Sequence, residues 1–119
     1  MAKGENFYYV VADVAPKMLE ALRKMHSTGH IHRDIKPDNY WVHKGKLYIT
    51  DLGLLKKVAD ENGNLIVVYE DVPGFVGTFA YASVNTHYRK SKSFRDDLES
   101  LGYTILNLLV GENVPSFEL

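Results

Sequence analysis

The sequence predicts an α+β domain that is mainly helical and carries small β-hairpins. Two segments, residues 13–28 and 94–109, repeat apolar side chains at the spacing of an α-helix. Between them, two short runs of β-forming residues flank the dipeptide Lys44-Gly45, which suits a tight turn. The chain has 119 residues, of which 45% are hydrophobic, and this size is sufficient for one domain with a modest core.

The first predicted helix spans residues 13–28. Asp13 is its expected N-cap, Pro16 is tolerated in its first turn, and Gly29 is a suitable stop. The preceding residues 7–11 are ambiguous, because their composition favours a strand although they could extend the helix across a kink near Pro16. The expected apolar face consists of Ala15, Met18, Leu19, Leu22 and Met25.

Residues 40–42 and 46–49 are the expected strands of the central hairpin. Asn39 precedes the first strand and Asp51 follows the second. Because the two ends of a hairpin lie side by side, we expect these two side chains to lie close together.

The second half of the chain contains a predicted turn, a short strand and a long helix. Asn62-Gly63-Asn64 is a turn signal, and residues 65–69 form the strand candidate. The helix spans residues 94–109, with Ser93 as N-cap and Asp96 as its reciprocal acidic partner. Since this helix is apolar on most sides, we expect it to be buried. Its apolar residues are Leu98, Leu101, Ile105, Leu106, Leu108 and Leu109.

The segment His32-Arg33-Asp34-Ile35-Lys36-Pro37-Asp38-Asn39 groups side chains suited to phosphoryl transfer, and Asp51-Leu52-Gly53 follows it. Such a transfer depends on positioning and charge neutralisation. Asp34 can orient an attacking hydroxyl and accept its proton, and Lys36 can offset phosphate charge. Asn39 and Asp51 offer the oxygen ligands that Mg²⁺ prefers. Gly53 is expected to let the backbone turn sharply after the metal ligand.

These two motifs resemble the catalytic loop and the metal-binding Asp-Phe-Gly element of protein kinases. The resemblance implies that residues 1–119 form an incomplete protein kinase domain, mainly a helical large lobe. Its parts would be a catalytic loop at 30–39, an Asp-Leu-Gly element at 51–53, an activation segment at 51–87 and a central helix at 94–109. ATP and Mg²⁺ are the cofactors it implies, and it favours a helix over residues 7–11.

The resemblance also implies a role for each matching side chain. Asp34 would be the catalytic base, and Lys36 would contact the phosphates of ATP during catalysis. Asn39 and Asp51 would hold the nucleotide-bound magnesium, and Thr78 would lie in the substrate-binding loop. Leu52 replaces the usual phenylalanine and keeps its apolar character.

Other interpretations of these residues remain open at this level. Asp97 would cap the backbone of the catalytic loop, but an exposed acid at a helix start is almost as plausible. His30, His32 and Asp34 would share one face if residues 30–34 formed a strand, as in a metallo-hydrolase site. That alternative leaves Lys36, Asn39 and Asp51-Leu52-Gly53 unexplained. The segment could also be a polar surface turn without chemistry, but several positions and a second motif agree with the phosphoryl-transfer interpretation. In the kinase interpretation His32 packs under the loop.

Two further segments resemble the casein kinase 1 group, which includes the tau-tubulin and vaccinia-related kinases. The stretch Gly77-Thr78-Phe79-Ala80-Tyr81-Ala82-Ser83-Val84-Asn85-Thr86-His87 has Ser-Val-Asn where most kinases have Ala-Pro-Glu. Arg95-Asp96-Asp97-Leu98-Glu99-Ser100-Leu101-Gly102-Tyr103 is similar to the start of that group's central helix. The resemblance implies transfer of the ATP γ-phosphate to protein serine or threonine.

The sequence contains no Gly-x-Gly-x-x-Gly phosphate loop and no Val-Ala-Ile-Lys strand, which are parts of a kinase small lobe. We therefore expect the small lobe to be absent from this chain and the chain alone to be an inactive fragment. A non-catalytic kinase-like binding module is the alternative function.

Four basic residues, Arg89, Lys90, Lys92 and Arg95, lie within seven positions before the second helix. They are either a solvated loop or an anion pocket beside the substrate groove. Together with the casein kinase 1 resemblance, the second possibility implies protein substrates that are acidic or already phosphorylated. Arg89, Lys92 and Arg95 are thus candidate substrate-binding residues with Thr78.

Composition excludes some other classes. A formal net charge of -1 gives no reason to expect nucleic acid binding. No apolar run is long enough to span a membrane, and no signal peptide is visible. The absence of cysteine fits a reducing compartment, so we expect an intracellular protein, cytoplasmic or nuclear. The apolar second helix also leads us to expect self-association of the isolated chain.

Overall fold

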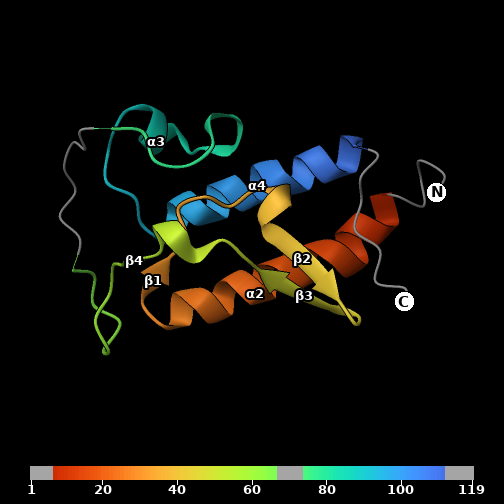
Figure 1. The fold of residues 1–119 in the computed structure, drawn as a ribbon, viewed down its shortest axis with the longest axis horizontal. Coiled ribbons are helices and arrows are strands. Elements are labelled where there is room, and N and C mark those ends of the chain that lie inside the picture. Colours follow the sequence, from red (N-terminus) through yellow and green to blue (C-terminus); the bar gives the residue numbers. More distant parts are fainter. Residues whose placement is uncertain (1–6, 67–73, 112–119) are drawn as a thin grey trace.

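Two long helices form the framework of the molecule. The computed structural model describes residues 7–66 and 74–111. Helix α2 (Ala15–Ser27) and helix α4 (Phe94–Val110) lie side by side, and the short helix α3 (Val84–His87) lies over the N-terminal part of α4 (Figure 1). None of the helices within the described residues is long and apolar enough to cross a membrane.

Two small antiparallel pairings complete the fold. Strands β2 (Tyr40–His43) and β3 (Lys46–Ile49) form the expected hairpin, which packs against α2 (Figure 1). Strands β1 (His30–Ile31) and β4 (Lys56–Lys57) pair next to the C-terminal end of α2. The described part of the chain is therefore α+β with a helical majority, as the sequence predicted.

The residues before α2 are helical, which settles the ambiguity over residues 7–11. A π-helical turn spans Val10–Val14 and joins α2 without a break, with the Ala15 amide donating to the Val10 carbonyl. Pro16 explains this turn, because a proline has no N–H for an α-helical bond and its ring collides with the carbonyl four residues earlier. Asp13 lies inside the turn, so its prediction as an N-cap was wrong.

The core is built on one row of α2 and its preceding turn. Val10, Val14, Met18 and Leu22 follow one another at intervals of four residues and are completely buried. Leu19, which we expected on this face, is 49% exposed. The π-helical turn aligns Val10 and Val14 with Met18 and Leu22 on the buried face. The spacing of apolar residues within 13–28 did not predict this alignment. The other members of the core are Ile35, Tyr40, Leu101 and Leu108.

The β2–β3 hairpin has the register and turn that its sequence predicted. Tyr40 pairs with Ile49, and both Lys44 and Gly45 have positive φ, at 50° and 75°, as a type I′ turn requires. The Tyr40 hydroxyl donates to the Met18 carbonyl at 3.2 Å and joins the hairpin to α2. Burial raises the pKa of Tyr40, so this hydroxyl remains a donor over the ordinary pH range.

The predicted turn at Asn62-Gly63-Asn64 is present and is organised by Asp60. The Asp60 carboxylate accepts from the amides of Asn62 and Asn64, each at 2.9 Å. Leu65 then bridges to Ala59. The remainder of the expected strand at 65–69 lies outside the described residues from position 67 onward.

Helix α4 starts and ends near the expected positions. The Asp96 carboxylate accepts from the Ser93 amide at 2.7 Å, which confirms the predicted acidic partner of the N-cap. One face, including Leu101 and Leu108, is buried, whereas Leu98, Leu106 and Val110 are between 45% and 84% exposed. The expectation that α4 is covered on most sides was therefore wrong for this chain. Its exposed apolar face leaves self-association a prediction.

Gly29 provides a test of how α2 connects to the β1–β4 pairing. Its φ is +83°, and an added Cβ would lie 2.5 Å from the Ala59 carbonyl oxygen. Gly63 has a similar φ of +82°, but nothing lies within 4 Å of its added Cβ. Both substitutions by alanine share the left-handed strain, so their difference isolates the collision with Ala59.

We therefore expect Gly29→Ala to lower the free energy of unfolding by at least about 1 kcal/mol more than Gly63→Ala does. Urea denaturation followed by circular dichroism measures both values. Equal losses would mean that Gly29 does not pack against Ala59 as the structure shows.

Candidate active site

The loop between β1 and β2 is held by one carboxylate of α4. Asp97 Oδ2 accepts from the His32 amide at 2.7 Å, and its Oδ1 accepts from the Arg33 amide at 3.0 Å. His26 Nε2 donates to the same Oδ2 at 2.8 Å. The Asp97 side chain is 2% exposed, so it is a buried anion with three donors. The prediction that Asp97 caps the loop backbone is confirmed.

The backbone at Arg33 needs this support. Its φ is 74°, a left-handed conformation that is unfavourable for a residue with a side chain. Arg33 Nε donates to the Leu54 carbonyl at 2.6 Å and so ties the loop to the segment after Asp51. Burial lowers the pKa of Arg33, and the charge of Asp97 acts against this shift.

His32 is a structural residue of the loop, as the kinase interpretation expected. It is fully buried, and its Nδ1 accepts from the Asp34 amide at 3.1 Å. The other nitrogen, Nε2, lies 2.8 Å from the Thr50 carbonyl and must therefore carry the proton. The ring thus fixes Asp34 relative to the end of β3.

His30, His32 and Asp34 do not form the metal site of the alternative interpretation. The strand that would align them ends at Ile31, and His30 Nδ1 contacts its neighbour Thr28. Among the described residues, no group of three or more histidine or acidic side chains could hold a metal ion.

The structure brings Asp34, Lys36 and Thr78 into one hydrogen-bonded set. The Thr78 hydroxyl donates to Asp34 Oδ1 at 2.7 Å and accepts from Lys36 Nζ at 2.9 Å. Lys36 Nζ also lies 3.7 Å from Asp34 Oδ2. These three residues come from positions 34, 36 and 78, so the fold joins the loop motif to the predicted substrate-binding segment.

Asn39 and Asp51 lie at the open end of the hairpin, and the proximity of their side chains stays a prediction. The Thr50 amide donates to the Asn39 carbonyl at 2.8 Å, which places Asp51 one residue from this backbone contact. Asn39 Nδ2 donates to the Asp34 carbonyl at 2.8 Å, so its Oδ1 is the atom that can ligate a cation. Asp51 is exposed. An amide oxygen and a carboxylate fit Mg²⁺, which takes few protein ligands and completes its shell with phosphates and water.

The sharp turn at Asp51-Leu52-Gly53 occurs at a residue other than the expected one. Asp51 itself has φ 60°, whereas Gly53 lies in a 3₁₀ turn from Leu52 to Leu54 without a positive φ. The expectation for Gly53 was therefore wrong. Asp51 can adopt this conformation because short polar side chains tolerate the left-handed region better than most others.

Gly77 is a site residue that the sequence analysis did not identify. Its φ is +109°, and an added Cβ would lie 2.7 Å from the Arg33 carbonyl and 3.8 Å from Asp34 Oδ1. A glycine is therefore needed for the Thr78 segment to approach the loop. A glycine directly before the substrate-loop threonine was the available signal.

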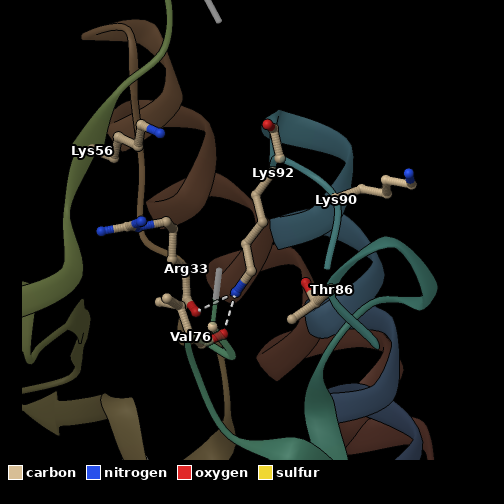
Figure 2. A pocket seen from close by; sticks show the side chains of 8 residues that line it. Arg33, Lys56, Val76, Thr86, Lys90 and Lys92 are labelled. Atoms are coloured by element: carbon tan, nitrogen blue, oxygen red, sulfur yellow. Dashed lines mark hydrogen bonds between the residues drawn. The ribbon is translucent and has the colours of Figure 1, made fainter. Parts of the chain in front are cut away.

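The four basic residues before α4 do not form one cluster. The Arg89 guanidinium lies over the Phe75 ring, 5.0 Å from its centre, and the Arg95 side chain is 57% exposed beside Asp96. Lys90 and Lys92 instead line a cavity of about 370 Å³ together with Arg33 and Lys56 (Figure 2). Sequence reasoning missed Arg33 and Lys56 because they are distant along the chain.

These contacts join the residues that the sequence analysis singled out as candidate site residues. Asp34, Lys36 and Thr78 form one hydrogen-bonded set, and the Asn39 side chain donates to the Asp34 backbone. Residues 7–118 match the sequence profile of the protein kinase domain. The chain therefore belongs to the protein kinase domain family.

The importance of Asp97 can be tested by the substitution Asp97→Asn. An asparagine has one acceptor oxygen and an NH₂ group, so it cannot accept from both loop amides and His26. We expect a loss of about 1–3 kcal/mol in the free energy of unfolding, because a buried donor is left without an acceptor.

Asp38→Asn is the matched control, because Asp38 lies in the same loop and is exposed. It should change the unfolding free energy by less than about 0.5 kcal/mol. If the two variants unfolded at the same urea concentration, the loop would not depend on Asp97.

Proposed function

We propose that this protein is a serine/threonine protein kinase of the casein kinase 1 group, which transfers the γ-phosphate of ATP to protein substrates. Membership of the protein kinase domain family supports a kinase function. The observation that carries the finer proposal is the set formed by Asp34, Lys36 and Thr78. A lysine two residues after the proposed catalytic aspartate, here Lys36 after Asp34, is a feature that resembles serine/threonine kinases rather than tyrosine kinases.

In this proposal Asp34 orients the substrate hydroxyl and accepts its proton. Thr78 donates to Asp34 Oδ1, and Asn39 Nδ2 donates to Oδ2 at a longer 3.4 Å, so both contacts orient the carboxylate toward the substrate. Lys36 Nζ lies 3.7 Å from that Oδ2, so it is close enough to the base to contact the phosphoryl group as it is transferred. Positioning of this kind accounts for most catalysis of phosphoryl transfer.

Asn39 Oδ1 and the Asp51 carboxylate would hold the magnesium of the nucleotide. Bound Mg²⁺ and ATP would supply the transferable phosphoryl group and neutralise its charge. Asn39 Nδ2 donates to the backbone of Asp34, so the proposed ligand and the base keep a fixed separation.

The Ser-Val-Asn stretch supports assignment to the casein kinase 1 group. Ser83 caps α3 by accepting from the Thr86 amide at 3.2 Å, and its hydroxyl donates to Asp96 Oδ1 at 2.7 Å. One side chain thus connects the substrate-binding segment to the start of α4. This supplies a physical role for serine at the position where most kinases have alanine.

The alternative is a non-catalytic kinase-like module that binds a partner. The sequence contains no Gly-x-Gly-x-x-Gly loop, and this favours the alternative for the 119 residues by themselves. Retention of Asp34, Asn39 and Asp51 favours the kinase, because a scaffold does not require them. The two functions are separated by testing whether a form of the protein that includes an ATP-binding small lobe phosphorylates a mixed serine and threonine peptide library.

In such a form, Asp34→Asn should lower the rate of phosphoryl transfer by about 10²–10⁴-fold, the usual effect of losing a positioned base. Asp38→Asn, at an exposed position four residues further along the same loop, should stay within a few-fold of the parent. Radiolabelled phosphate incorporation measures both. A rate for Asp34→Asn close to that of Asp38→Asn would contradict the assignment.

The cavity lined by Arg33, Lys56, Lys90 and Lys92 supports a preference for acidic or already phosphorylated substrates. Its cationic side chains lie next to the loop that carries Asp34, and such groups bind carboxylates and phosphates. This assignment revises the expected pocket, since Arg89 and Arg95 lie outside it.

We expect faster phosphorylation of peptides with acidic residues N-terminal to the target than of neutral ones. The ratio should fall as salt is added, because exposed charges are screened. Lys56→Ala combined with Lys90→Ala should lower it, whereas Arg95→Ala should not. Equal rates on both peptide classes at low salt would exclude the cavity as a substrate site.

A further inference from the structure

Lys92 joins two segments of backbone that are far apart in the sequence. Its Nζ donates to the Arg33 carbonyl at 3.0 Å and to the Val76 carbonyl at 2.6 Å (Figure 2). The first carbonyl precedes Asp34, and the second precedes Gly77. The amine therefore connects the catalytic loop to the segment that carries Thr78.

The position of Lys92 itself is fixed by the start of α4. It directly precedes Ser93, whose amide donates to Asp96 Oδ2 at 2.7 Å. The other oxygen of Asp96 accepts from Ser83 at 2.7 Å. The segment between Ser83 and Ser93 is thus bonded to Asp96 at both ends, which restricts the position of the Lys92 backbone.

The amine lies in a partly buried and mixed electrostatic environment. Burial lowers the pKa of Lys92 to about 8, and Arg33 lowers it further, while Asp97, Asp96 and Asp34 act in the opposite direction. Lys56 and Lys90 also line the cavity, although the Lys90 side chain extends away from Lys92 (Figure 2). A neutral amine still has two N–H groups for the two carbonyls, so both bonds survive deprotonation.

We infer that Lys92 is a positioning residue that clamps the catalytic loop to the substrate-binding segment and so maintains the contact between Asp34 and Thr78. The distances support this role over direct substrate binding, because the amine is already engaged by two backbone oxygens. Gly77 agrees with it, since an added Cβ there would lie 3.3 Å from Lys92 Nζ and 2.7 Å from the Arg33 carbonyl. Only the catalytic consequence of the clamp rests on the proposed kinase function.

Amide hydrogen exchange of the 119-residue chain tests the clamp without any activity assay. At pH 7, Lys92→Met should lower the protection of the His32, Arg33 and Asp34 amides, which donate to Asp97 and His32, by about tenfold or more, because the loop loses its bond from a charged donor to the Arg33 carbonyl. Lys56→Met removes a cation from the same cavity and should leave that protection unchanged. A Lys92→Met value within twofold of the parent would overturn the inference.

The pH dependence separates the clamp from a merely space-filling role. The pKa of Lys92 is about 8 in the closed state, and an ordinary lysine of an opened segment titrates near 10.5. The opened segment therefore holds its proton more tightly, so raising the pH favours closure. Linkage predicts about a tenfold gain in protection, corrected for intrinsic exchange, between pH 7 and 9.

Lys92→Arg and Lys92→Met should both abolish this gain, because guanidinium stays charged and methionine does not titrate. A gain that persists in either variant would overturn the inference. In an ATP-binding form, Lys92→Met should also lower kcat with little change in the KM for ATP. If Lys92→Met does not change amide exchange, the clamp is wrong. If it changes exchange but not kcat, the result counts against the proposed function alone.

Discussion

The rest of the site depends on two hydrogen bonds, in which the backbone amides of His32 and Arg33 donate to the Asp97 carboxylate. The hydrogen bond from the Arg33 amide offsets the unfavourable left-handed conformation of this residue, whose φ is 74°. That conformation directs the Arg33 side chain to Leu54 and its carbonyl to Lys92. The residue that follows is Asp34. Helix α4 thus determines the course of a loop that lies more than sixty positions earlier in the sequence.

A second constraint comes from the close approach of the segment around Gly77. The glycine admits the Arg33 carbonyl, and Thr78 then reaches Asp34 and Lys36. The hairpin adds the third part by placing the ends of β2 and β3 together at Asn39 and Thr50. The loop after β1, the segment around Gly77 and the start of the hairpin therefore meet at the Asp34 carboxylate. Hydrogen bonds to backbone groups hold each of the three in place.

Local patterns in the sequence were sufficient for the two long helices, the hairpin and the Asn62-Gly63-Asn64 turn, but not for the short helix α3, which lies in a segment expected to be a loop. They failed at Asp13, because the effect of Pro16 extends backward into a π-helical turn that apolar spacing does not reveal. They also failed for the exposed face of α4, since composition alone does not specify which neighbours cover a helix.

The site was predictable where motif residues are close in sequence or have a recognised partner. The contacts that join Asp34, Lys36, Asn39 and Thr78 agree with the motif analysis in this sense. The cationic cavity was not predicted, because Arg33 reaches it from the loop after β1 and Lys56 from strand β4. Likewise, the partners of Lys92 are carbonyl groups, which every residue possesses, so no side-chain pattern could have identified them.

The central claim is that Asn39 and Asp51 form one cation site beside Asp34. Paramagnetic broadening of backbone amide signals by Mn²⁺ with ATP tests this most directly, because broadening falls steeply with distance from the ion. The account predicts that signals near Asn39 and Asp51 broaden first and that Asp51→Asn greatly weakens the effect. Broadening centred instead on the acidic turn at Asp60 and Glu61, or unchanged in Asp51→Asn, would contradict it.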